Sequence, residues 1–135
     1  MALQFSILAG NARLDAIETY IGALPILRIY SGSPPALTTT AASGTLLAEM
    51  TLPSDWMNAG ASRSKTKLGT WQETSANAAG TAGYFRILES TGTTTAIQGT
   101  VTATAGGGDM TLDNAVLALA QVVTVNTFTL TDGNA

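Results

Sequence analysis

The sequence contains no cysteine and no histidine, and only 11% of its 135 residues are charged, against about 25% in an ordinary soluble domain. Without cysteine, disulfides, zinc–thiolate sites and thiol nucleophiles are excluded. Without histidine, Ser-His-Asp triads and imidazole metal ligands are excluded, and the usual general base near neutral pH is missing. We therefore expect a protein that is not an enzyme, with no catalytic residue, no cofactor and no metal site.

Positive charge is also scarce, since six Lys and Arg stand against nine Asp and Glu and give a net charge of -3. Nucleic-acid binding depends on a surplus of cations, so we expect no direct nucleic-acid partner. The longest apolar run, residues 115–125, is about half of a membrane span, and the N-terminus lacks the basic region of a signal peptide. We therefore expect no membrane partner. A surface rich in Thr, Ala and Gly favours close contact with other protein.

One segment has a helical period. Leu14, Ile17 and Ile21 form an apolar stripe, which predicts a short helix over residues 11–22 that Asn11 caps and Gly22 ends. The opposite side is expected to carry the charged residues Arg13, Asp15 and Glu18. The helix either packs on its own sheet or forms an arm that docks on a neighbouring subunit.

The rest of the chain is typical of β-structure. Short β-branched or alternating segments predict strands at 26–30, 45–52, 62–71, 84–89, 95–102, 110–112 and 122–130, with 116–120 either a strand or a connection. Glycine- and proline-rich turns separate them at spacings typical of antiparallel sandwiches and barrels. The fold expected is mainly β: a single domain over residues 1–135, an antiparallel β-sandwich or jelly-roll-like fold with one short N-terminal helix.

Half of the cations lie in one segment. Arg63, Lys65 and Lys67 have the i, i+2, i+4 spacing that places side chains on one face of a strand. These charges either protect an exposed edge strand from aggregation or contact an acidic patch on a protein partner. Phosphate binding is a third possibility, with only three cations to support it.

Two large apolar residues, Trp56 and Met57, lie in the expected loop before this basic segment. Either they cap the core or they anchor an interface, where Trp and Met are enriched. The candidate partner-contact residues are therefore Trp56, Met57, Arg63, Lys65 and Lys67.

Two carboxylates, Asp109 and Asp113, flank the turn that contains three consecutive glycines. A calcium ion needs six to eight oxygen ligands at dense spacing, and that spacing is absent. Turn capping is the favoured role for both.

Four segments together resemble small virion proteins of tailed phages and prophages: LDAI (14–17), LRIYSGSPP (27–35), GTLLAEMTL (44–52) and GTAGYFRI (80–87). Within that class the chain is similar to the head decoration, or cement, proteins of short-tailed phages, some of which have a jelly-roll-like β fold. The matching segments consist of turn and strand residues, so no binding residue follows from the resemblance.

The resemblance implies a non-enzymatic capsid decoration protein that binds and stabilises the lattice of the major capsid protein. Its partners would be the major capsid protein and further copies of itself, as a dimer or trimer. It would be made in the host cytoplasm and lie on the outer surface of the capsid head. The alternatives are a tail or fibre adhesin module that binds host-surface glycan and, less favoured, a small hydrolase that uses carboxylates.

Overall fold

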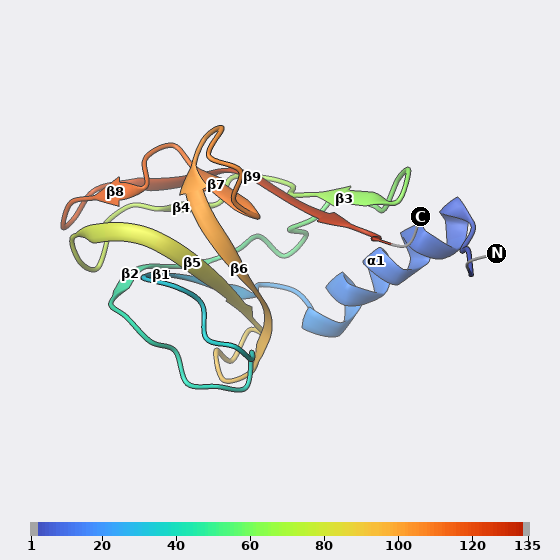
Figure 1. Cartoon of the computed structure of the whole chain (residues 1–135), viewed down its shortest axis with the longest axis horizontal. Helices are drawn as coiled ribbons and strands as arrows, with labels where there is room; N and C mark the ends of the chain where they lie inside the picture. Colours follow the sequence, from blue (N-terminus) through green and yellow to red (C-terminus); the bar gives the residue numbers. More distant parts are fainter. Residues whose placement is uncertain (1–2, 134–135) are drawn as a thin grey trace.

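The computed structural model describes residues 3–133, which form one helix and nine strands (Figure 1). The helix α1 (Ile7–Ile21) comes first. The strands are β1 (Ile26–Ser31), β2 (Leu46–Thr51), β3 (Ser64–Thr66), β4 (Gln72–Glu73), β5 (Gly80–Leu88), β6 (Thr95–Ala103), β7 (Met110–Leu112), β8 (Val116–Leu117) and β9 (Val123–Thr131).

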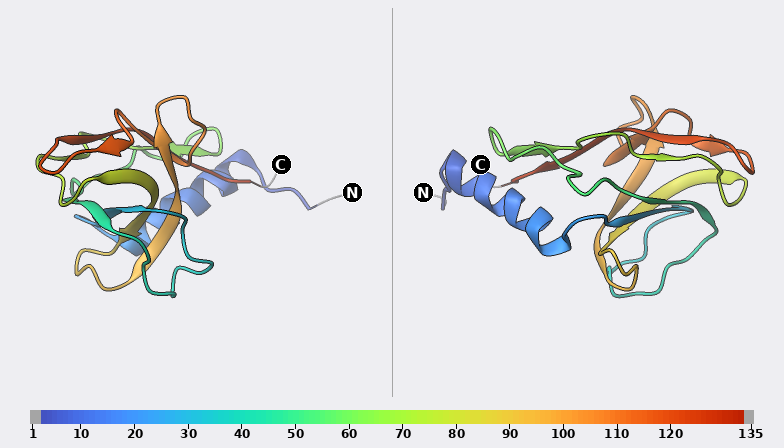
Figure 2. Two further views of the ribbon diagram at one scale, coloured as in Figure 1. Left: turned by 60° about the vertical axis from the view of Figure 1, so that its left-hand side comes forward. Right: turned by 180° about the vertical axis from the view of Figure 1, so that it is seen from behind.

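All nine strands belong to one sheet in the order β2-β1-β5-β6-β7-β9-β3, with β4 paired to β9 and β8 paired to β5. The pairs are antiparallel except β6 with β7, which run parallel. The sheet is strongly curved, and β9 passes over β5 in both Figure 1 and Figure 2. The mainly β class with an N-terminal helix is confirmed, but the sheet is mixed, is not closed, and shows no second facing sheet in the described residues.

The core lies on the concave side of this curved sheet. Trp71 and Phe128 have ring centroids 5.5 Å apart, and Phe128 meets Phe85 edge-on at the same distance. Phe85 lies on β5 and Phe128 on β9, so these contacts join strands that are distant in the sheet order. A one-sided core of this kind is what a curved sheet needs to bury the apolar face of each strand.

The opposite face of the sheet is covered by the long loop between β1 and β2. Tyr84 stacks on Tyr30 with 5.0 Å between ring centroids, and its hydroxyl donates to the Ser43 carbonyl at 2.6 Å. Tyr84 and Phe85 point to opposite faces, yet both are buried. Both can be buried because the β1–β2 loop covers the face that carries Tyr84.

Helix α1 projects from one end of the molecule, as Figure 1 and the right-hand view of Figure 2 show. It begins at Ile7, one turn earlier than expected, because the Ser6 hydroxyl accepts a hydrogen bond from the Ala9 backbone and caps it. Asn11 therefore lies inside the helix. Gly22 ends it as expected, with φ at 83° and its N–H donating to the Glu18 carbonyl.

Candidate functional site

Trp56 and Met57 lie in the core, where their side chains are 0% and 2% exposed. The Trp56 indole donates to the Gly22 carbonyl at 3.1 Å, and its ring centroid is 5.9 Å from that of Trp71. The loop therefore supplies core side chains and fastens the end of α1. Burial of both residues excludes them as direct interface anchors in this structure.

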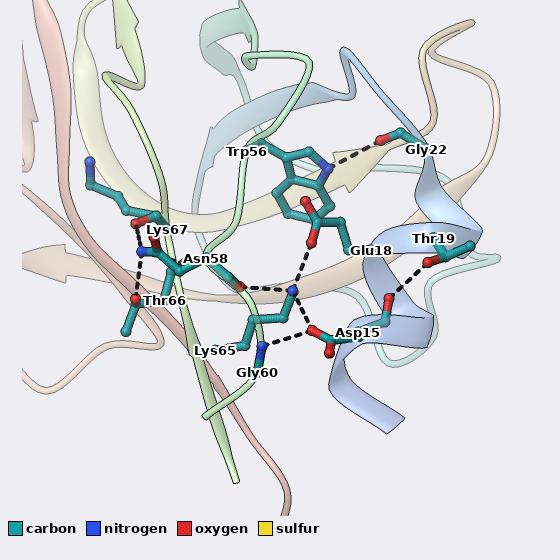
Figure 3. Close-up of polar contacts among 10 residues, drawn as sticks. All are labelled: Asp15, Glu18, Thr19, Gly22, Trp56, Asn58, Gly60, Lys65, Thr66 and Lys67. Atoms are coloured by element: carbon teal, nitrogen blue, oxygen red, sulfur yellow. Dashed lines mark hydrogen bonds and ion pairs between the residues drawn. The ribbon is translucent and has the colours of Figure 1, made fainter. Parts of the chain in front are cut away.

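Lys65 joins the helix to the sheet (Figure 3). It is 2% exposed, and its ammonium is 2.7 Å from a carboxylate oxygen of Asp15 and 2.7 Å from one of Glu18. Its third donor reaches the Asn58 carbonyl at 2.8 Å. An ammonium has three donors, so Lys65 is fully satisfied inside the chain.

This arrangement shifts the pKa of two groups. The hydrogen bond from Lys65, helped by one from the Gly60 backbone, lowers the pKa of Asp15. Burial acts to lower the pKa of Lys65, but its hydrogen bonds and charge interactions with Asp15 and Glu18 outweigh burial and raise it. Both shifts favour the charged forms of Asp15 and Lys65, so the ion pairs between α1 and Lys65 contribute most to stability near neutral pH.

The expectation for the charged side of the helix is wrong for Asp15 and Glu18. Leu14 and Ile21 are buried as predicted, but both carboxylates are ion-paired with the buried Lys65, and only Asp15, at 46% side-chain exposure, also reaches solvent to a large extent. Ile17 of the expected stripe is exposed. The helix is thus attached largely through polar contacts, which a search for apolar periodicity does not detect.

Arg63, Lys65 and Lys67 do not share one exposed face. Arg63 has a φ of 62° and lies in a turn, because β3 covers only Ser64–Thr66 and not the predicted 62–71. Its guanidinium is 2.8 Å from Asp132, which also accepts from Arg13 at 2.9 Å. Positive φ at this position breaks the alternation on which the prediction depended.

Lys67 is the one member of the three without an ion pair to a carboxylate among residues 3–133. Its ammonium donates to the Gly69 carbonyl at 2.9 Å and lies 5.9 Å from the Trp71 ring centroid. A basic strand face able to meet an acidic patch is therefore absent from the described chain. Nor is β3 a bare edge, since Asn58 donates its backbone N–H to the Thr66 carbonyl.

The side of α1 that faces away from the sheet carries one charged side chain, Arg13. Its exposed residues include Leu8 and Tyr20, at 79% and 75% exposure, and between them Ala12, Ala16 and Thr19. Seven of the large exposed apolar side chains in the described chain lie in the first 24 residues, and we call them the N-terminal apolar surface: Leu3, Phe5, Ile7, Leu8, Ile17, Tyr20 and Leu24.

Such a concentration in one part of the chain is notable, because large exposed apolar side chains usually occur singly on soluble monomers. At roughly 100 Å² of exposed area per large side chain, these seven side chains expose about 700 Å² in total, distributed around α1 and its two flanking segments, so that one partner subunit would cover part of this area. The sequence contained a signal for it, since the apolar residues Leu3, Phe5, Ile7 and Leu8 precede the predicted helix and belong to no predicted helix or strand.

Asp109 and Asp113 form local hydrogen bonds, Asp109 to β6 and Asp113 within its own turn and to β9. Asp109 accepts from the backbone and the hydroxyl of Thr100, both at 2.8 Å. Asp113 accepts from the backbone of Asn114 at 2.9 Å. Among residues 3–133 no group of three carboxylates converges in a way that would hold a metal ion.

Within the same described range, α1 is too short and too polar to cross a membrane, and no longer helix is present.

Comparison with protein-family models, with curated proteins and with solved structures gives no match to this chain.

Proposed function

We propose that this protein is a non-enzymatic structural component of a tailed-phage particle, a capsid decoration protein that binds the outer surface of the major capsid protein lattice and stabilises it. The observation that carries the proposal is the N-terminal apolar surface. The resemblance of four sequence segments to head decoration proteins supports the same function.

The N-terminal apolar surface suits a permanent protein contact. The two charged side chains of its helix that are about half exposed are both paired inside the chain: Asp15 with Lys65, and Arg13 with Asp132, the latter lying over the Phe5 ring at 4.9 Å. Burying this surface therefore desolvates little charge, which keeps the cost of association low. The polar junction at Lys65 fixes the helix before it meets a partner, and such preorganisation favours affinity.

A protein that binds only the assembled lattice stabilises it by RT ln(1 + [L]/Kd) per site. Many copies acting together would resist the outward pressure of packaged DNA. The partners in this proposal are the major capsid protein and neighbouring copies of the same chain, and the location is the outer surface of the virion head.

The test is rebinding to purified capsids from which the protein has been removed. We expect the wild-type protein to rebind and to raise the temperature at which the capsids disrupt. Leu8→Ser should weaken rebinding at least tenfold without changing the melting temperature of the free protein. Failure of the wild type to rebind would overturn the proposal.

Leu119→Ser is the matched control. Leu119 is 68% exposed and follows β8, at the end of the molecule away from α1 (Figures 1 and 2). This variant should rebind like the wild type. An equal loss in both variants would show that the N-terminal apolar surface has no special role.

A glycan-binding adhesin module is the alternative function. Sugar sites commonly combine aromatic platforms with polar groups, and in the described chain the exposed aromatic side chains, Phe5 and Tyr20, both belong to the N-terminal apolar surface. Specific binding of the isolated protein on a glycan array, together with no binding to capsids, would favour this alternative.

A further inference from the structure

Four polar side chains form a row across the face of the sheet that the β1–β2 loop covers. In the strand register, Glu49 of β2 lies opposite Arg28 of β1, Arg28 lies opposite Arg86 of β5, and Arg86 lies opposite Gln98 of β6. Glu49 forms an ion pair with Arg28. The row thus holds two guanidinium groups and one carboxylate, and like charges that face each other across strands are unfavourable.

Arg86 is the guanidinium without a carboxylate. It is 5% exposed, and no ion pair joins it to an acidic residue among residues 3–133. One terminal nitrogen donates to the Thr40 carbonyl at 2.7 Å, while the buried Nε has no hydrogen-bond partner. Buried charges are normally paired, because an uncompensated one is expensive.

The groups nearest to Arg86 in sequence and register do not neutralise it. The facing Gln98 has an unbonded Oε1, so a small shift or a water molecule can satisfy Nε. A neutral amide still leaves the positive charge uncompensated. Glu89 is occupied in its own turn, where it accepts from the hydroxyl of Thr91 and from the backbone of Thr93 at 2.8 Å.

Arg86 lines a depression between the β1–β2 loop and the turn that joins β5 to β6. The depression, here called the threonine pocket, has a volume of about 340 Å³ and is lined by residues 38–41, Arg86 and residues 93–95. Six of these residues are threonines, and apart from Thr93, whose hydroxyl donates to Glu89 at 2.8 Å, their hydroxyls can donate hydrogen bonds to an anion beside the guanidinium. The sequence alone did not indicate this site, because its residues come from two distant segments, the β1–β2 loop and the β5–β6 hairpin.

We propose that the threonine pocket binds a carboxylate group, supplied by an Asp or Glu side chain of a neighbouring protein subunit. One guanidinium matches a single negative charge and presents two parallel N–H donors, the geometry that a carboxylate accepts. A phosphate carries more charge than one arginine compensates. No aromatic ring lines the pocket, so it lacks the stacking platform that would favour an acidic sugar.

The claim that a neighbouring subunit supplies the carboxylate rests on the proposed function. The claim that the pocket binds a carboxylate does not. The isolated protein therefore provides the first test. We expect N-acetylglutamate α-amide, which has one carboxylate, to cause saturable NMR shifts of the Arg86 Nε–H and the amides of residues 93–95. Binding should be in the millimolar range, and the neutral N-acetylglutamine α-amide should produce no such shifts.

Two variants address Arg86 independently of each other. Arg86→Gln should weaken carboxylate binding at least tenfold. Thr39→Glu places a carboxylate of the chain itself at the rim of the pocket, and it should compete with the added ligand and raise the melting temperature. If Arg86→Gln does not fold, Thr39→Glu decides the question, because it leaves Arg86 in place.

The matched controls are Lys67→Gln, which removes a cation elsewhere, and Thr39→Gln, which adds side-chain bulk without charge. Both should bind the carboxylate ligand like the wild type. The site is overturned if the wild type gives no saturable shift, or if the glutamine compound binds equally well. Tenfold tighter binding of sialic acid would overturn the protein side chain as the ligand.

The capsid assay separates the two proposals. Arg86→Gln should rebind depleted capsids at least tenfold more weakly than the wild type. Normal rebinding by this variant would overturn the carboxylate as a capsid contact while the decoration function stands. If no form of the protein rebinds capsids but the isolated pocket binds carboxylate, the decoration function fails and the site remains.

Discussion

The structure buries two cations, Lys65 and Arg86, and treats them in opposite ways. Lys65 makes three bonds, two of them to carboxylates of α1, and so holds the helix against the β3 end of the sheet. Arg86 makes one bond, to a backbone carbonyl, and faces a pocket lined with hydroxyls. The difference indicates that the first cation is used to build the fold, while the second retains the capacity to bind an anion from outside.

The largest effect is expected from removing the paired cation. Lys65→Met leaves Asp15 and Glu18 facing a site without positive charge. Breaking a fully buried pair costs about 3–5 kcal/mol, and because Asp15 is partly exposed we expect about 2–3 kcal/mol here. Urea unfolding measures this. Lys67→Met is the control and should change the free energy of unfolding by no more than about 0.5 kcal/mol.

The same junction predicts a pH dependence. Because the pKa of Asp15 is lowered in the folded state, its contribution to stability is present above its ordinary value near 3.8 and is lost as the pH falls through the depressed pKa. The raised pKa of Lys65 gives a contribution present below about 10.5 and lost as the pH rises through the raised value.

The stability difference between wild type and Lys65→Met should therefore be largest between about pH 5 and 10 and should shrink at both extremes. Glu89, whose pKa is strongly lowered by hydrogen bonds from the Thr91 hydroxyl and the Thr94 backbone, titrates in both proteins. Its effect cancels in the comparison. A difference independent of pH would contradict the assigned role of the Lys65 ion pairs.

A smaller effect is expected where an arginine loses its carboxylate. Glu49→Gln leaves Arg28 unpaired, as Arg86 is in the wild type. Both partners are partly exposed, so the loss of stability should be about 0.5–1 kcal/mol. NMR titration with N-acetylglutamate α-amide should then show a second, weak binding site at Arg28. If no such site appears, an unpaired guanidinium on this face is not sufficient to bind a carboxylate.

The smallest effect on stability is expected at Arg86. Arg86→Met removes an uncompensated buried charge and keeps most of the side-chain volume, so the free energy of unfolding should change by less than about 1 kcal/mol. Carboxylate binding should nevertheless be lost. A destabilisation as large as that of Lys65→Met would mean that Arg86 is compensated within the chain, and it would remove the contrast between the two cations.

Local sequence signals predicted many elements but not their attachment. Gly22 ends the helix as expected, and β7 covers the predicted residues 110–112. The prediction failed at residues 62–71, where Ser62 and Arg63 have positive φ and form a turn before a strand of three residues. Residues other than glycine rarely adopt such backbone angles, so the sequence contains no local sign of this turn.

The expected sandwich failed for a related reason. Alternation along each segment predicts which residues form strands, but it does not define whether the strands divide into two sheets or follow one another in a single curved one. Here β7 pairs with both β6 and β9, so the long strands β5, β6 and β9 belong to one continuous sheet. Trp56 and Met57 became core residues because their loop closes over that curved sheet.

By itself, the sequence determined the mainly β class, the position of the helix end, the absence of cysteine and histidine chemistry, and the scarcity of charge. Tertiary structure decided which of the few charged side chains form ion pairs with one another. Lys65 and Arg86 are both cations within strands, yet one meets two carboxylates from a helix 50 residues away and the other meets none. Electrostatic pairing depends on distance in space, and only the folded chain brings Asp15 and Glu18 to Lys65.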